Sequence, residues 1–295
     1  MSEPSKLWTP DTEPAFMGNT LEQIVVAYSE YLRVREPLQH TLFQLRLKDD
    51  PDAAKSEAAV FSWLRSQKLA PSINEKPGQT GADFMCSPKG SSPFLLEVTC
   101  LNANSVESKS KWFAELKGLA GKFVMVTPQL QVKANSKVRQ LSIGNLPGVL
   151  AVCLSHPSAT ALLSTLAAAW LMVSEPKIEV PVPTEDGENP HANLVTDLRY
   201  SVFLDNRDGE VVTKCKSISA VLLIALWDKH LEIVGLLHPE PIVPFDYRSF
   251  PRVPFARIEW PLKDSIHMEW VIADPSAASC EHRKVTFTND ELTGQ

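Results

Sequence analysis

Apolar side chains recur at helical spacing in two segments near the beginning of the chain. In Leu21–Val34 they fall on one side of a helix, which Pro37 is expected to stop. The acidic turn 48–51 ends in proline and starts a second helix, Ala53–Lys68. Each helix therefore has one apolar face that must pack against another part of the fold.

Apolar runs of strand length follow, separated by residues that favour turns. A weak strand is expected near Ser72–Glu75, a second at Ala82–Ser87 and a buried third at Phe94–Leu101. Prolines and a glycine between the second and third strands predict a hairpin. The uninterrupted apolar run Leu146–Ser155 is typical of a strand that is buried on both faces.

Three more segments are expected to be helices and one a loop. Ser105–Leu119 has a helical pattern, and a threonine and a proline can open the next helix, 127–141. Ala159–Val173 is almost entirely apolar and is expected to be a buried helix. The segment 176–193 contains several prolines and turn residues, which predict a loop.

Closer to the C-terminus, the pattern of apolar residues again predicts strands. Ile218–Leu226 and Leu231–Leu237 are expected to pair as a hairpin, and the proline- and aromatic-rich segment His238–Phe255 to form an ordered loop on the sheet. This order of elements predicts an α/β fold with a central mixed β-sheet flanked by helices.

We expect one principal α/β domain. It spans residues 50–260 and includes a loop insertion near 176–196. A helical extension, 1–49, precedes the domain, and a C-terminal tail, 261–295, follows it.

Composition and charge narrow the class of protein. The net charge of −6 and the pI of about 5.7 argue against a general nucleic-acid coat, although an enzyme needs positive charge only in its binding groove. Five widely spaced cysteines without a CxxC motif indicate reduced thiols and a cytoplasmic protein. The longest apolar stretch has roughly 15 residues, short of the roughly 20 that cross a bilayer, so no membrane is expected.

Two acidic residues lie within predicted strands, where an ionised carboxylate is costly unless it is paired or binds a cation. They are Asp83 and Glu97, and a hairpin around Ser91 brings them close together. Thr99 shares a strand face with Glu97 because side chains alternate. Two adjacent carboxylates repel, and Mg²⁺ or Mn²⁺ relieves the repulsion. The pair therefore predicts metal-assisted hydrolysis of a phosphodiester.

The sequence Gly-Ala-Asp at 81–83, followed by Glu-Val-Thr at 97–99, resembles the PD-(D/E)XK nuclease-like superfamily. The order of elements extends the resemblance over residues 50–155. It implies a restriction-endonuclease-like core and a metal-dependent nuclease in which Asp83 and Glu97 hold the metal. Glu57, in the preceding helix, matches an additional acid of some relatives, and Glu75 is a weaker alternative.

Thr99 departs from the family pattern, because the family usually has a catalytic lysine at this strand position. Some relatives place the lysine on the next helix instead. Lys133, Lys137 and Gln140 follow one another at i, i+4 and i+7, so they lie on one side of that predicted helix. The resemblance therefore makes Lys137, or less favourably Lys133, the substitute for the missing lysine.

Two alternatives stay open. The chain can be a degenerate member that keeps the scaffold and serves in binding or assembly, or an unrelated α/β protein in which the two acids are ordinary. The motifs HExxH, GxxxxGK[ST] and GxSxG do not occur, which argues against zinc hydrolases, P-loop proteins and α/β-hydrolases. The expected partners are nucleic acid, DNA more than RNA, and in a homodimer a second copy of the chain.

Overall fold

The structure, a computed structural model, describes residues 19–75, 81–101, 119–142, 144–155, 163, 165–173, 176–179, 193–196, 198, 201–226, 231–261, 267–273 and 281–286. Its helices are α1 (Leu21–Arg35), α2 (Pro37–Asp49), α3 (Pro51–Ser66), α5 (Leu119–Leu141), α6 (Thr165–Val173) and the 3₁₀-helix Tyr247–Ser249. Its strands are β1 (Pro71–Ile73), β2 (Phe84–Cys86), β3 (Phe94–Leu101), β4 (Gly148–Leu154), β5 (Pro176–Glu179), β6 (Asn193–Thr196), β7 (Leu204–Arg207), β8 (Glu210–Thr213), β9 (Ala220–Leu226), β10 (Leu231–Leu237), β11 (Pro254–Ile258), β12 (His267–Ile272) and β13 (Glu281–Thr286).

A mixed sheet of nine strands, in the order β1-β2-β3-β4-β9-β10-β11-β12-β13, forms the centre of the fold. Strands β3, β4 and β9 run parallel, β1-β2-β3 form an antiparallel meander, and β9 and β10 form the expected hairpin. Two small hairpins, β5–β6 and β7–β8, lie outside this sheet. The predicted α/β class, with a mixed sheet flanked by helices, is confirmed.

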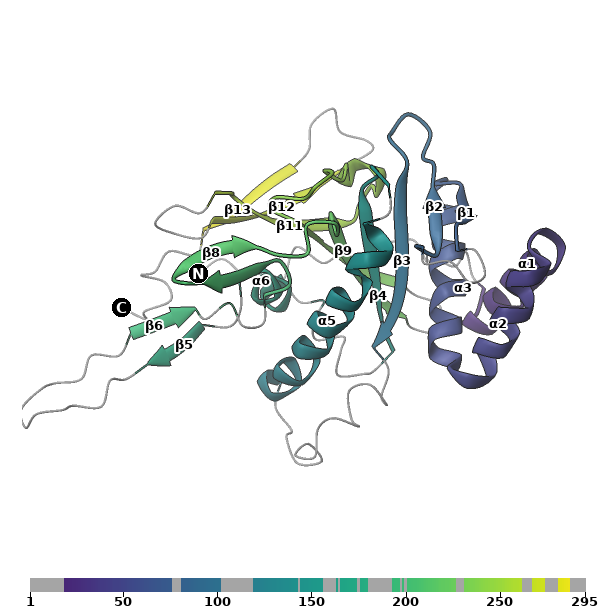
Figure 1. Cartoon of the computed structure of the whole chain (residues 1–295), viewed down its shortest axis with the longest axis horizontal. Coiled ribbons are helices and arrows are strands. Elements are labelled where there is room, and N and C mark those ends of the chain that lie inside the picture. Colours follow the sequence, from purple (N-terminus) through teal and green to yellow (C-terminus); the bar gives the residue numbers. More distant parts are fainter. Residues whose placement is uncertain are drawn as a thin grey trace, which may run out of the picture.

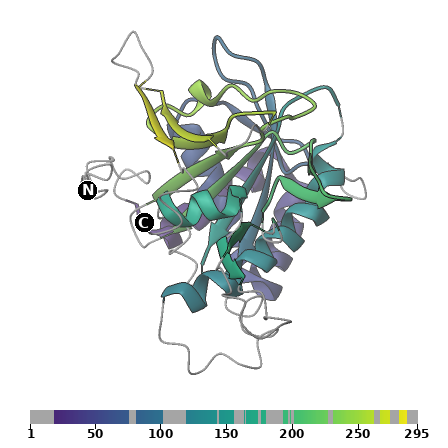
Figure 2. The ribbon, with the colours of Figure 1, turned by 90° about the vertical axis from the view of Figure 1, so that its left-hand side faces the viewer.

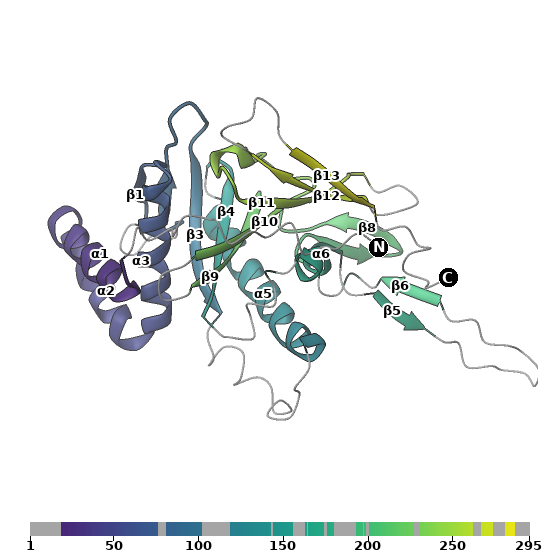
Figure 3. The same cartoon turned by 180° about the vertical axis from the view of Figure 1, so that it is seen from behind.

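Helices cover both faces of the sheet. In Figure 2 the purple helices α1 to α3 lie behind the sheet and the teal helices α5 and α6 lie in front of it. Each face has its own apolar core, one including Tyr28, Phe61 and Phe84, and the other including Leu95, Leu130 and Leu150. Strand β3 lies between α3 and α5 (Figures 1 and 3). A polar side chain on either face of β3 is therefore enclosed by a helix.

Local signals fix the first three helices. The side chain of Thr20 caps α1 in a capping box with Gln23, and Asp50 caps α3 by accepting from the amide of Ala53. Pro37 follows the end of α1, as predicted, but it also occupies the first turn of α2, where a proline is favourable. Helix α2 was not predicted. It packs with α1 against α3, so the expected extension 1–49 shares the core of the sheet in its described part.

Two segments near the C-terminus differ from the prediction. The expected tail, 261–295, contains β12 and β13, which are strands of the central sheet. The expected loop 176–193 begins with β5, which pairs with β6, whereas residues 180–192 lie outside the described residues. The segment 238–255 is an ordered connection as predicted, with Phe245 and Phe250 buried, except that its last two residues begin strand β11.

Of two helices predicted in the middle of the chain, one begins earlier than expected and the other falls outside the described residues. Helix α5 begins at Leu119 rather than at Thr127, so Pro128 lies inside it. An interior proline removes one backbone donor, and tertiary packing of Leu130 and Ala134 outweighs this cost. The predicted helix 105–119 lies outside the described residues, apart from its last position. Among the described helices, none is both long and apolar enough to cross a lipid bilayer.

Candidate active site

Asp83 and Glu97 meet at the edge of the β2–β3 ladder. The ladder pairs Phe84 with Leu96, so the backbone of Asp83, one residue before β2, lies opposite that of Glu97 in β3. The backbone amide of Asp83 donates to Oε2 of Glu97 at 3.2 Å, and the amide of Val98 donates to Oδ2 of Asp83 at 2.7 Å. The predicted proximity is confirmed. Asp83 lies immediately before the strand and not within it, because its carboxylate takes the amide of Val98.

Lys137 reaches Glu97 from helix α5. Its Nζ donates to Oε1 of Glu97 at 2.6 Å, and the side chain of Glu97 is only 1% exposed. Helix α5 packs Leu130 on the same face of β3 from which Leu95 projects, two residues before Glu97. This packing directs Lys137 at the acid.

The other predicted residues lie close to this contact. Thr99 is buried on the face of β3 that carries Glu97, where the resemblance would place a lysine. Gln140 donates from Nε2 to the carbonyl of Gly81 at 3.4 Å and so holds the segment that leads to Asp83. For Lys133 the described contacts include none of its ammonium group. Among the described contacts, Lys137 therefore reaches Glu97, Gln140 reaches only the backbone near Asp83, and Lys133 reaches neither acid.

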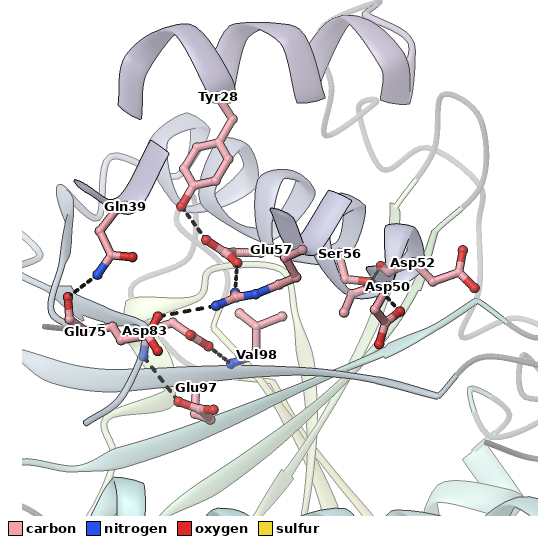
Figure 4. A network of polar contacts seen from close by, with 12 residues as sticks. Tyr28, Gln39, Asp50, Asp52, Ser56, Glu57, Glu75, Asp83, Glu97 and Val98 are labelled. Atoms are coloured by element: carbon pink, nitrogen blue, oxygen red, sulfur yellow. Dashed lines mark hydrogen bonds and ion pairs between the residues drawn. The ribbon is translucent and has the colours of Figure 1, made fainter. Parts of the chain in front are cut away.

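A second set of polar side chains approaches the acids from the helices (Figure 4). Arg46 in α2 donates to Oε2 of Glu57 in α3 and lies 3.5 Å from Oε2 of Glu75. The hydroxyl of Tyr28 in α1 donates to Oε1 of Glu57 at 2.7 Å. Both carboxylate oxygens of Glu57 are thus engaged. In Figure 4 this network and the carboxylate of Asp83 lie on the side of β3 that α1 to α3 cover, whereas the carboxylate of Glu97 lies on the other side, where α5 supplies Lys137.

Burial and mutual repulsion make these acids hard to ionise. Burial raises the pKa of Asp83 well above its ordinary value, and the charges of Glu97 and Glu57 raise it further. Burial also raises the pKa of Glu97, although the ammonium of Lys137 opposes this. The pKa of Glu57 is raised by burial, and Arg46 opposes the rise. When all three acids are ionised, they carry more negative charge than Lys137 and Arg46 balance.

A divalent cation fits this charge. Mg²⁺ commonly takes only one or two carboxylates, and water and phosphate oxygens fill its remaining positions. Asp83 and Glu97 supply two carboxylates, and the described hydrogen bonds use both oxygens of Glu97 but only one of Asp83. Within the described residues, no group of three or more His, Cys, Asp or Glu side chains is arranged to hold a metal. Glu57 remains a predicted ligand. To bind a metal, it would have to give up its hydrogen bond with Arg46.

Arg46 and Tyr28 were not predicted to belong to the site. Tyr28 is in α1 and Arg46 in α2, within the predicted N-terminal extension. One signal was available, because Arg46 lies between Leu45 and Leu47, and a charged residue in an apolar setting usually has a partner. Tyr28 had been assigned only to the apolar face of its helix.

Comparisons with known proteins add no further evidence. The chain matches no family model, no curated protein and no solved structure.

Proposed function

We propose that the chain is a magnesium- or manganese-dependent nuclease of the PD-(D/E)XK type, with a restriction-endonuclease-like core. The observation that supports this best is the contact of Lys137 with Glu97, beside Asp83. The order α3-β1-β2-β3-α5-β4, with a meander followed by a parallel strand, also agrees with the resemblance in the sequence. The proposed partner is nucleic acid, DNA more than RNA. A homodimer stays a prediction, which the mass of the purified chain in solution tests.

The proposed mechanism uses each residue at its observed position. A bound Mg²⁺ would supply a more acidic water and offset negative charge on the phosphodiester. Asp83 and Glu97 would orient it, since backbone amides fix both carboxylates. Lys137 would stabilise the charge that develops on the phosphate, as the strand lysine of the family does. Thr99 is uncharged and cannot take that role.

Cleavage of labelled DNA by the purified chain tests the proposal. We expect cleavage with Mg²⁺ or Mn²⁺ and none with EDTA, because the acids alone cannot activate a water. The Asp83→Asn variant, prepared identically, guards against a contaminating nuclease and is expected to be inactive. Equal cleavage by both proteins, or none by the wild type on single-stranded DNA, duplex DNA and RNA, would contradict the proposal.

The degenerate scaffold is the second candidate. The observation that favours it is the engagement of Glu57 by Arg46 and Tyr28, which satisfies that acid without a metal. In this case the chain would bind a partner through the same scaffold and hydrolyse nothing.

Thermal unfolding with and without Mn²⁺ separates the two candidates. The raised carboxyl pKa values mean that the folded state holds protons which the unfolded chain has lost. Without metal, the free energy of unfolding therefore falls as pH rises from about 4 through the raised values. Mn²⁺ binds the ionised pair, so its stabilisation should increase over the same range. At a Mn²⁺ concentration of 100 times the dissociation constant, we expect the free energy of unfolding to rise by about 2.7 kcal/mol.

The matched control is the Asp83→Asn, Glu97→Gln double variant, in which the pair has no charge at any pH. We expect Mn²⁺ to leave its melting temperature unchanged from pH 5.5 to 8.5. A metal-dependent shift of equal size in wild type and control would place the binding elsewhere. No shift in the wild type would favour the scaffold.

A further inference from the structure

A hollow of about 640 Å³ opens between the C-terminal parts of α1 and α3, away from Glu97 and Lys137. Its charged rim consists mainly of Arg35, Arg65 and Lys68, with one acid, Glu36. In the described part of the chain, none of the three basic side chains forms an ion pair with a carboxylate. The hollow is thus locally positive on a chain whose net charge is −6.

Aromatic rings line the inner wall of the hollow and hold one of the cations. The guanidinium carbon of Arg65 lies 5.7 Å from the ring centre of Tyr31 and 5.9 Å from that of Phe61. Such cation–π contacts orient a guanidinium without using its N–H donors. Arg65 is therefore positioned in advance to donate to an anionic oxygen that enters the hollow.

The hollow connects to the acid cluster through packed rings. Tyr31 stacks with Tyr28, whose hydroxyl donates to Glu57, and Phe61 packs against Phe84, the residue after Asp83. The hollow and Asp83 therefore border the same apolar core, on the α1–α3 side of the sheet.

We propose that this hollow binds a single-stranded stretch of nucleic acid, with the three cations on its phosphates and a base against Tyr31; this rests on the proposed function. Bases of a single strand can enter a hollow and stack on an aromatic ring, whereas bases in a duplex are already paired and stacked. A rim of fixed positive charge that surrounds aromatic rings suits the strand better than a flat basic surface would.

Fluorescence anisotropy with a labelled 20-nucleotide single-stranded DNA in EDTA tests the inference without requiring cleavage. We expect Arg65→Glu and Arg35→Glu each to weaken binding by about tenfold, and to reduce the dependence of affinity on salt. Arg33→Glu is the matched control: Arg33 is in the same turn of α1 as Arg35, and it is exposed and paired with Glu30. It should bind like the wild type.

Competitors identify the ligand. Unlabelled single-stranded DNA should displace the probe at lower concentration than duplex DNA, and inorganic phosphate should displace it only at far higher concentration. Equal weakening by Arg33→Glu and Arg65→Glu, or stronger competition by duplex or by free phosphate, overturns the inference. Because EDTA prevents cleavage, binding through the hollow can succeed even if the proposed hydrolysis fails, and the two failures are told apart.

Discussion

Replacing Lys137 with methionine is expected to lower the rate of metal-dependent cleavage by about 10²- to 10⁴-fold. The ammonium of Lys137 lies 2.6 Å from Oε1 of Glu97, which is a metal ligand in the proposed function. Methionine keeps much of the length and packing of the side chain and removes the charge. The rate of cleavage under single-turnover conditions, at saturating Mn²⁺, measures the effect.

Lys133→Met is the control for this prediction. Lys133 lies one turn earlier on α5, so the variant makes the same chemical change on the same helix without touching Glu97. It is expected to cleave at nearly the wild-type rate. If the two variants were equally active, Lys137 would have no catalytic part, whatever its contact with Glu97.

Moving the lysine from helix α5 to strand β3 gives a second test of its role. In the Lys137→Met background, Thr99→Lys restores a lysine at the position that the family pattern uses, on the strand face that Glu97 shares. We expect partial recovery of cleavage, because the charge returns to the same acid from the strand instead of the helix. The melting temperature of the double variant shows separately whether the buried position accepts the longer side chain.

The meeting of Asp83 with Glu97 was predictable from the sequence because both of its causes are local. A short connection between two consecutive strands favours a hairpin, and the period of two fixes which side chains of a strand share a face. The approach of Lys137 to Glu97 was predictable from the helical spacing of Lys133, Lys137 and Gln140 together with the resemblance. Each of these inferences needed only neighbouring elements.

Helix α2 was missed for a physical reason. Its exposed residues include Leu38, Leu42 and Leu45, whereas Gln39 is buried beside Phe43. The pattern of apolar residues therefore does not mark the buried face of this helix. Buried Gln39 donates to a backbone carbonyl at Glu75, a partner that is distant in the sequence.

Strand β12 has a local signal in the sequence. Met268 and Trp270 are buried and alternate with the less buried His267 and Glu269, which is the pattern of a half-buried strand. Its partners in the sheet depend on tertiary packing, which a single sequence does not specify. The same limit applies to Arg46, whose partners Glu57 and Glu75 lie on other elements.

Replacing Arg46 with methionine is expected to lower the free energy of unfolding by about 2 to 4 kcal/mol, somewhat less than for a fully enclosed ion pair. Arg46 is the cation shared by Glu57 and Glu75, and the side chain of Glu57 is only 12% exposed. Without it, Glu57 keeps the hydroxyl of Tyr28 as a donor but has no opposite charge. Urea denaturation at pH 7.5 measures the loss.

The pH dependence identifies the cause of this loss. Without Arg46 the pKa of Glu57, already raised by burial, rises further, so the folded variant retains a proton that the unfolded chain releases. The loss of stability should therefore be small near pH 4 and grow as pH rises from the pKa of Glu57 in the unfolded chain to its pKa in the folded variant.

Adding Glu57→Gln to the Arg46 variant should recover part of the stability, because no charge is then left unpaired. Lys48→Met, an equal change of charge at an exposed position of α2, should have little effect. A deficit that is independent of pH and unchanged by Glu57→Gln would mean that Arg46 stabilises α2 by packing, and that its charge does not balance the acids next to Asp83.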